Sequence, residues 1–171
     1  MNWLSSAPEE QVKEPEDAPK DAALHPLKGR AIVVTGAASG IGRATALLLA
    51  ASGARLALTD QDQDAGREIC AKIRDDHKTD VVFATLDVTD HDAVAKLMRT
   101  FLKSYKRLDG LVNCAGVNLD LIPQHETPME LYRKTMDINV QGSYSFCQAY
   151  LQGILSPNNL VQPPSGCYSI V

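Results

Sequence analysis

The sequence predicts an α/β protein built on a doubly wound parallel sheet, with helices on both faces. Two observations carry this prediction. Short apolar segments rich in β-branched residues alternate with longer amphipathic segments, and a glycine-rich turn follows the first apolar segment. Strands that alternate with helices of roughly 10 to 15 residues form βαβ units, whose strands pair in parallel. Such crossovers are right-handed, which leaves few topologies to consider.

Each element is predicted from its own pattern. Residues 31–35 (AIVVT) form a continuous apolar run, typical of a strand buried on both faces. The later strands are expected at 55–59, 81–86 and 111–113, and the helices at 41–52, 64–76, from 90 onward, and over roughly 128–155. Gly53 can end the first helix. The helix from residue 90 places its apolar side chains on one face, and these are Val94, Leu97, Met98, Phe101 and Leu102.

The two ends of the chain differ from this pattern. Residues 1–26 hold four prolines and six acidic against two basic side chains, so we expect a disordered acidic leader. Residues 27–171 would form the domain. Residues 156–166 are expected to form a proline-rich loop, and residues 167–171 open a fifth strand in which the sequence stops. We therefore expect a sheet that is incomplete, or truncated, at its C-terminal side, with an unpaired edge.

Composition excludes several classes of protein. The formal net charge of −4 gives no reason to expect nucleic acid or an anionic membrane as a partner. The four cysteines form no CxxC pair, and His25, His77 and His91 are scattered, so no metal site is expected. The N-terminus lacks the basic and apolar regions of a signal peptide. A cytoplasmic location is the expectation.

The strongest chemical signal is the loop Thr35-Gly-Ala-Ala-Ser-Gly-Ile-Gly42, which leaves a predicted strand and opens a helix. Gly36 allows a tight turn, Gly40 lets the backbone approach a pyrophosphate, and Gly42 lets the helix pack closely. The helix N-terminus attracts the anionic pyrophosphate. Ser39 can add a hydroxyl contact, and Ile41 belongs to the same loop. The prediction is a Rossmann-like dinucleotide site.

Asp60 supports this prediction. It ends the second strand, 18 residues after Gly42, where a carboxylate can accept hydrogen bonds from the ribose hydroxyls of adenosine. A carboxylate there repels a 2′-phosphate, and Gln61, Asp62 and Gln63 add no cation. NAD is therefore favoured over NADP. The alternative is that Asp60 is only a turn residue or a helix cap.

Four ordered motifs resemble the N-terminal, cofactor-binding part of the short-chain dehydrogenase/reductase family, and the resemblance covers about residues 27–171. They are the glycine loop, Leu86-Asp-Val88, Asn113-Cys-Ala-Gly116 and Asp137-Ile-Asn-Val140. The resemblance implies that Asp87 and Val88 contact the adenine, although Asp87 could instead only begin the turn before a helix. It also implies that Asn113, Ala115 and Gly116 line the cofactor, and that Asn139 serves the catalytic proton relay. Cys114 is expected to be a small buried residue rather than a nucleophile.

The resemblance also implies catalytic residues that the 171 residues lack. In this family a tyrosine transfers the substrate proton, a lysine four residues later lowers its pKa, and a serine orients the substrate. None of the five tyrosines here is followed by such a lysine. The expected activity is thus hydride transfer between a nicotinamide cofactor and a small alcohol or ketone, with this chain alone inactive. His125 could act as a base, but an exposed loop histidine is the favoured interpretation.

Two alternatives stay open at this stage. The chain could be a non-catalytic nucleotide-binding or interaction protein, or a wrongly ended gene product without a role of its own. The helix from residue 128 resembles half of the family's usual subunit interface, which allows a homo-oligomer. Substrate, reaction direction and oligomeric state are not predicted.

Overall fold

The computed structural model describes residues 25–118, 125, 128–155 and 169–170. Most of the predicted leader and all of the loop expected at 156–166 lie outside these residues. The strand expected over 167–171 is described only at its residues 169–170.

The core of the fold is a five-stranded sheet in the order β3-β2-β1-β4-β5, and every pair of neighbours is parallel. This confirms the doubly wound α/β prediction. The strands are β1 (Ala31–Thr35), β2 (Arg55–Asp60), β3 (Val81–Thr85), β4 (Gly110–Asn113) and β5 (Ser169–Ile170).

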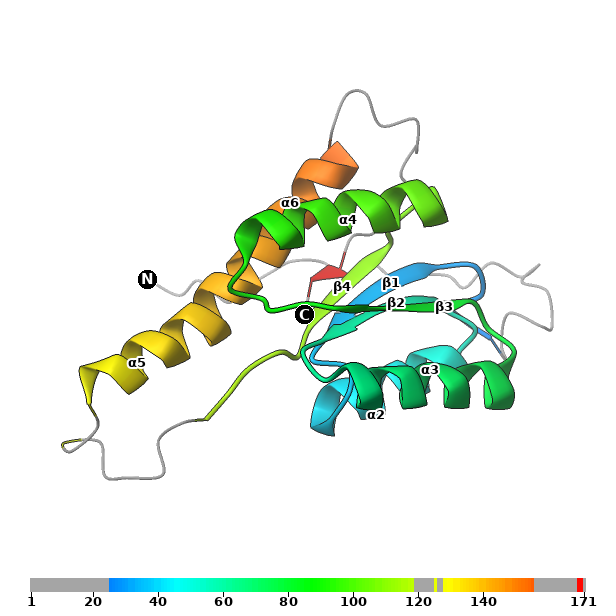
Figure 1. Ribbon diagram of the computed structural model, residues 1–171. Helices are drawn as coiled ribbons and strands as arrows, with labels where there is room; N and C mark the ends of the chain where they lie inside the picture. The colour runs from blue at the N-terminus through cyan, green and yellow to red at the C-terminus, as the bar shows by residue number, and fades with distance from the viewer. Residues whose placement is uncertain (1–24, 119–124, 126–127, 156–168, 171) are drawn as a thin grey trace, which may run out of the picture.

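Helices cover both faces of the sheet (Figure 1). One face carries α2 (Gly40–Ala51) and α3 (Gln63–His77), and the other carries α4 (His91–Tyr105) and α6 (Ser143–Leu155). The predicted long helix is one rod made of α5 (Met129–Met136), the π-helical segment η2 (Asp137–Gly142) and α6, and its α5 end reaches beyond the sheet. The predicted boundaries of the first strand are exact, and the others differ from the observed ones by at most two residues.

The side chains of β1 alternate between the two apolar cores. Ile32 and Val34 pack with α2 and α3, whereas Ala31 and Val33 pack with α4 and α6. Because β1 is central and buried on both faces, its uninterrupted apolar sequence is required by its position. The strand thereby fixes the place where the loop after Thr35 leaves the sheet.

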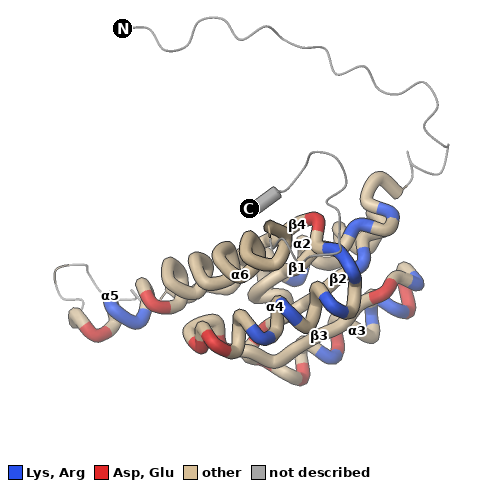
Figure 2. The backbone as a smooth tube through the Cα atoms, turned by 90° about the horizontal axis from the view of Figure 1, so that it is seen from above, with Lys and Arg blue, Asp and Glu red and all other residues tan. Residues whose placement is uncertain are grey.

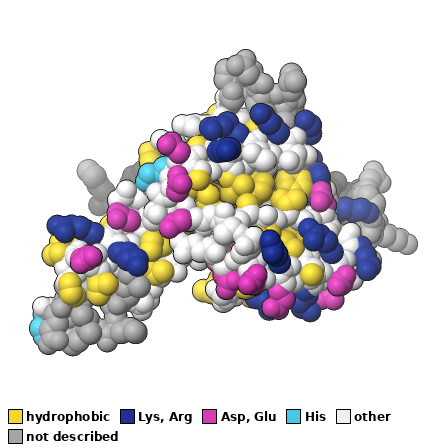
Figure 3. Space-filling view, in the orientation of Figure 1, with side chains coloured by type: hydrophobic (Ala, Val, Ile, Leu, Met, Phe, Trp, Pro, Cys, Tyr) yellow, Lys and Arg dark blue, Asp and Glu magenta, His cyan; other side chains and the backbone are white. Residues whose placement is uncertain are grey.

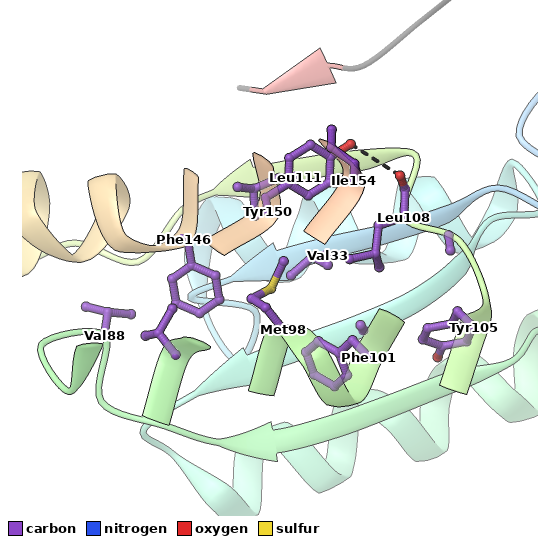
Figure 4. Packing of buried hydrophobic residues seen from close by; sticks show 13 residues of the cluster. Val33, Val88, Met98, Phe101, Tyr105, Leu108, Leu111, Phe146, Tyr150 and Ile154 are labelled. Carbon is purple, nitrogen blue, oxygen red and sulfur yellow. Dashed lines mark hydrogen bonds between the residues drawn. The ribbon is translucent and has the colours of Figure 1, made fainter. Parts of the chain in front are cut away.

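Large side chains from α4 and α6 fill the second core (Figure 4). Met98 and Phe101 on α4 meet Phe146 and Tyr150 on α6, and all four are buried. The predicted apolar face of α4 is correct for Val94, Met98 and Phe101, while Leu97 and Leu102 are only half-buried. The face extends instead to Tyr105, whose hydroxyl donates to the carbonyl of Leu56 at 2.6 Å.

The helix ends show how local sequence sets the element boundaries. Asp62 caps α3 and Asp90 caps α4, each through a side-chain oxygen that accepts backbone N–H groups of the first turn. Both helices end at a lysine in the left-handed region, Lys78 at φ 54° and Lys106 at φ 60°. Gly53 follows α2 with φ 86°, as expected of a residue that ends this helix.

A charged cluster ties the amino ends of β1 and β4 together. The Asp109 side chain is only 5% exposed and pairs with Arg30 and Arg107. It also accepts the backbone N–H of Ala31 at 2.8 Å. Burial by itself raises the pKa of Asp109, but the hydrogen bonds from Arg107, Ala31 and Arg30 outweigh it and hold this pKa below its ordinary value.

Charge is distributed unevenly over the helices. Figure 2 shows Lys, Arg, Asp and Glu along α3 and α4, whereas α6 contains none of them. Figure 3 shows an apolar band between charged side chains on the face that carries β3 and α4. Among the described residues, no helix is long and apolar enough to cross a membrane. In the same residues, no group of three or more His, Cys, Asp or Glu side chains could hold a metal ion.

Candidate functional site

A pocket of about 450 Å³ lies where the carboxyl ends of the first four strands meet. Its volume falls in the range of roughly 300–1,000 Å³ typical of small-molecule sites. β1 lies between β2 and β4, so the chain order reverses there, which is where ligands bind in open α/β sheets. The lining residues are Gly36, Ser39, Gly40, Ile41, Gly42, Asp60, Gln61, Leu86, Val88, Cys114, Ala115, Gly116, Val117 and Ile138.

Most of the residues predicted from the sequence come together in this pocket. The structure places the five loop residues, Asp60, Val88, Ala115 and Gly116 in its lining. Asp87, Asn113 and Asn139 lie beside it in the chain but are not among the lining residues. His125 also lies outside the lining, in a segment of which the structure describes only this residue.

The three glycines of the loop are required for three different reasons. Gly36 has φ +63°, and a Cβ there would meet the backbone of Cys114 and Ala115 at 2.6–2.7 Å. A Cβ on Gly42 would meet the carbonyl oxygen of Gly36 at 2.0 Å. Gly40 has φ +49°, and a Cβ there would meet nothing within 4 Å. Only at Gly40 does the missing side chain leave open space, so a ligand can approach the backbone there.

The N-terminus of α2 opens into this space. Ser39 is the N-cap residue, but its hydroxyl makes no capping hydrogen bond. Ile41, in the first turn, is 80% exposed and lines the pocket. The first turn of α2 contains no acidic residue, so no side chain of the helix itself offsets its positive dipole. An anion is therefore favoured at this end of the pocket.

Asp60 connects the ends of β2 and β1. One carboxylate oxygen accepts the backbone N–H of Ala38 at 2.9 Å, and the other accepts that of Asp62 at 3.1 Å. The helix cap is Asp62 and not Asp60, so the alternative of a capping Asp60 is wrong, although Asp60 does shape the turn. The carboxylate thus faces the glycine loop and lines the pocket at once.

Asp87 begins the turn before α4 and also keeps its charge near the pocket. The backbone N–H and the hydroxyl of Thr89 both donate to Oδ1 of Asp87, at 2.9 and 2.8 Å. These two bonds, with smaller contributions from the amide of Gln61 and the charge of Lys134, hold the pKa of Asp87 below its ordinary value despite partial burial. Asp87 thus forms the turn before α4, which was one of the two roles considered for it. Its other carboxylate oxygen, Oδ2, makes no bond to Thr89.

Thr35 fixes the segment that follows β4. Its buried hydroxyl oxygen accepts the backbone N–H groups of both Cys114 and Ala115 at 3.1 Å. Asn113 donates to the sulfur of Cys147 at 3.5 Å, while its buried Oδ1 has no hydrogen-bond partner among the described residues. Burial raises the pKa of the Cys114 thiol, which is the opposite of nucleophile activation.

Asn139 lies in the π-helical segment and holds the other side of the pocket. The N–H of Val117 donates to its Oδ1 at 2.8 Å, and its Nδ2 donates to the carbonyl of Val117 at 2.8 Å. Short π-helical segments inside α-helices are frequent at functional sites. The same segment approaches the pocket through Gly142, where a Cβ would meet Val88 Cγ2 at 2.6 Å.

Arg43 carries the basic group closest in sequence to the glycine loop on α2, and it is directed elsewhere. It pairs with Glu68 of α3 at 3.1 Å. Among the residues that the structure describes, no lysine, arginine or histidine belongs to the pocket lining. The charge of the described site therefore comes from Asp60 and from the helix dipole of α2.

Sequence reasoning missed several pocket residues. Gln61 enters the sequence-based prediction only as the absence of a cation, and Val117 lies one residue beyond a recognised motif. Ile138 lies inside the motif Asp137-Ile-Asn-Val140, but no role was predicted for it. Thr35 was named as the end of a strand, without a role. Its position directly before Gly36 could have suggested one, because a hydroxyl at the end of a central parallel strand can bond the neighbouring strand.

Comparison with known proteins agrees with this geometry. The family model for the short chain dehydrogenases matches residues 30–159. A 2,5-dichloro-2,5-cyclohexadiene-1,4-diol dehydrogenase of Sphingobium indicum is 36% identical over 124 residues, which cover 72% of this chain and 48% of that protein. D-threitol dehydrogenase of Mycolicibacterium smegmatis is 37% identical over 123 residues, covering 72% of this chain and 46% of that protein. The chain spans about half the length of the curated relatives that it matches.

Solved structures have the same fold. A short-chain dehydrogenase from Shigella flexneri, complexed with NADP, superposes with a TM-score of 0.73 at 28% identity, covering 79% of this chain and 57% of that one. A short-chain type dehydrogenase/reductase from Mycobacterium ulcerans gives a TM-score of 0.72 at 25% identity and covers 75% of this chain and 48% of that one.

Proposed function

Because the chain belongs to the short-chain dehydrogenase/reductase family, we propose that its pocket binds NAD and that the whole protein is an oxidoreductase acting on a small alcohol or ketone. The observation that carries this proposal is the backbone geometry at Gly40. Its positive φ and the open space in front of it leave backbone exposed at the N-terminus of a helix. That arrangement suits a pyrophosphate.

The other parts of the dinucleotide follow from the strand order. Asp60 and the end of β2 would hold the adenosine ribose, and Asp87 and Val88 after β3 would hold the adenine. Asn113 at the end of β4, with Ala115 and Gly116 after it, would line the nicotinamide side. The bound nicotinamide supplies the hydride chemistry, and the chain's own residues bind, orient and shield it. Asn139 would contribute to the proton relay beside Val117.

NAD is the preferred cofactor in this proposal. Asp60 lines the pocket, Arg43 is paired with Glu68, and no basic side chain of the described part of the chain lines the pocket. A 2′-phosphate would meet a negative charge without a compensating cation. The relative from Shigella flexneri is complexed with NADP, so the preference rests on the residues of this chain alone.

The 171 residues are proposed to bind the cofactor without turning over substrate. The family's catalytic step needs a tyrosine followed four residues later by a lysine, and the 171 residues contain no such pair. The alternative is a protein that uses nucleotide binding for interaction and not for catalysis. Longer transcripts that continue in frame with this pair would exclude that alternative.

A homo-oligomer and a cytoplasmic location complete the proposal. Helix α6 has no charged residue, and it exposes Tyr144, Leu151 and Leu155 beside a hollow of about 510 Å³. Apolar surface of this kind is typical of protein interfaces. Sedimentation velocity of the protein with and without a Leu151→Lys substitution would test this part.

The proposal is tested by comparing two glycines with the same backbone strain. Gly40 and Gly29 both have positive φ, and a Cβ at either would meet nothing within 4 Å, but only Gly40 lines the pocket. We expect Gly40→Ala to weaken NADH binding at least about tenfold, and Gly29→Ala to leave it unchanged. Both should lower stability by about 1 kcal/mol. Equal NADH affinity in both variants and the wild type would contradict the assigned site.

A further inference from the structure

The two ends of the sheet carry opposite charge. Each of the strands β1 to β4 has one or two basic residues at its first position or in the four positions before it. These residues form the amino-edge patch: Lys28, Arg30, Arg55, Lys78, Lys106 and Arg107. At the carboxyl end of the sheet, residues 60–64 and 86–92 carry six acidic side chains and no lysine or arginine. Figure 3 shows dark-blue basic side chains on the right of the view, where α3 and α4 end and β3 begins.

The amino-edge patch keeps most of its positive charge. The same positions hold two acidic residues, Asp80 and Asp109, which form salt bridges with the three arginines of the patch. Six basic against two acidic side chains leave a formal excess of four positive charges. Lys78 and Lys106 are exposed and form no salt bridge with another described residue. The patch can therefore attract a polyanion through these lysines.

The same chain contains an acidic segment of matching charge. Residues 9–21 hold six acidic side chains and two lysines, a formal excess of four negative charges, and lie outside the described residues. The described chain begins at His25, which lies at the amino end of the sheet. The N–H of Leu27 donates to the carbonyl of Ser52 at 2.9 Å, and a Cβ on Gly53 would meet the Cβ of His25 at 3.1 Å. The acidic segment is thus joined to the chain beside the patch.

The distances allow this segment to reach the whole patch. Neighbouring strands lie about 4.8 Å apart, so the amino ends of β3 and β4 are within about 10 Å of that of β1. An extended chain spans up to about 3.4 Å per residue, which gives about 14 Å for the part between Asp21 and His25 and more for the other acids. Covalent attachment also gives the segment an effective concentration on the order of millimolar. An acidic partner in solution would have to match this concentration to compete.

We propose that residues 9–21 dock on the amino-edge patch of their own chain and screen it from other polyanions. The contact is electrostatic and joins carboxylates of the segment to Lys78, Lys106 and the arginines beside them. A single exposed ion pair contributes little, so the contact requires several pairs and should weaken with salt. The patch lies at the end of the sheet opposite the pocket, and the inference does not depend on the proposed binding of NAD.

Carbodiimide cross-linking of the full 171-residue chain tests this contact, because the reagent joins a carboxylate to a lysine amine only where the two meet. At about 20 mM NaCl we expect mass spectrometry to identify cross-links from residues 9–21 to Lys78 and Lys106. At about 0.5 M NaCl, where the screening length falls to about 4 Å, their yield should decrease at least about fivefold. A mixture of isotope-labelled and unlabelled chains separates cross-links within one chain from those between two chains.

Two double variants make the result specific. Glu14→Gln with Glu16→Gln removes two charges from the segment and should lower the cross-link yield of its remaining acids at least about threefold. Asp64→Asn with Asp92→Asn is the matched control, because it removes the same charge from exposed positions at the carboxyl end of the sheet. The control should keep the wild-type yield. A labelled peptide of ten glutamates should bind the segment variant at least about threefold more tightly than the wild type, since the patch is then less screened.

Each outcome decides the proposal. Salt-dependent cross-links within one chain, reduced only in the segment variant, would support it. Cross-linked pairs that carry both labels would overturn it and assign the patch to a second copy of the chain. An absence of cross-links to both lysines at low salt would also overturn it, as would an equal loss in the control variant. Tight binding of the glutamate peptide to the wild type, without cross-links from the segment, would show that the patch is open to other acidic partners.

Discussion

The backbone N–H of Ala38 donates to Asp60 at 2.9 Å, so a carboxylate at the end of β2 holds the glycine loop that follows β1. One hydrogen bond thereby joins the proposed ribose site to the proposed pyrophosphate site. A substitution at Asp60 changes the charge that a ligand meets and also the loop on which it lies.

Two substitutions at Asp60 separate these effects. Asp60→Ala should weaken NADH binding by about tenfold to a hundredfold, since it removes hydrogen bonds to a charged group. NADPH should lose less, because its phosphate no longer faces a carboxylate. Asp60→Asn keeps an acceptor for Ala38 and should raise NADPH affinity relative to NADH. Calorimetric titration measures both, and an equal loss for the two cofactors would show that Asp60 does not contact the ribose.

Gly142 and Val88 should be energetically coupled. A Cβ at Gly142 would lie 2.6 Å from Val88 Cγ2, so Gly142→Ala should destabilise the chain by about 1–3 kcal/mol through overpacking. Val88→Ala opens space for the added methyl group. Urea unfolding of the single and double variants should give a coupling free energy of at least about 1 kcal/mol. If the effects of the two single substitutions on the free energy of unfolding are additive, the helix instead shifts to accommodate the added methyl group.

Asn139 should stabilise the segment after β4. Asn139→Ala leaves the N–H and carbonyl groups of Val117 without their partner, and should cost about 1–3 kcal/mol of unfolding free energy. Gln141→Ala is the matched control, because its bond to Asp137 is exposed on the same π-helical segment. The control should cost less than about 0.5 kcal/mol. Equal shifts of the melting temperature in both variants would contradict the claim that Asn139 specifically stabilises the segment after β4.

Asp109 should make stability depend on acidic pH. Its pKa is lowered in the folded chain, so its contribution is present above an unfolded pKa of about 3.9 and is lost as the pH falls through the lower folded pKa. Asp109→Asn should therefore cost about 2–4 kcal/mol at pH 7, and the difference from wild type should shrink below about pH 4. Asp80→Asn, which breaks an exposed pair with Arg55, should cost about 1 kcal/mol or less. Urea unfolding at several pH values measures this, and a difference that stays constant down to pH 3 would contradict it.

Those parts of the fold that depend on local pattern could be predicted from the sequence. The apolar run at residues 31–35 predicts a central strand, and the glycine loop predicts the pocket beside it. Hydrophobic periodicity was less informative for α4. Tyr105 is buried although it is partly polar, because the carbonyl of Leu56 accepts its hydroxyl hydrogen. Such a partner, 49 residues away, cannot be predicted from a local pattern.

The contacts between strand ends could not be predicted for the same reason. Thr35 accepts two N–H groups from a segment about 80 residues later, which lies beside it only because β1 and β4 pair in register. The π-helical segment at residues 137–142 also lacked a sequence signal, since one extra residue per turn leaves the local composition unchanged. Spatial neighbours of this kind require the assembled sheet.

The left-handed lysines at the ends of α3 and α4 have a practical consequence. Lys78 and Lys106 adopt a conformation that costs a residue with a side chain about 1 kcal/mol relative to glycine. Both lie at the amino ends of the strands, at the edge of the sheet remote from the ligand pocket. Replacing these two lysines by glycine should therefore raise the free energy of unfolding without changing any residue of the pocket.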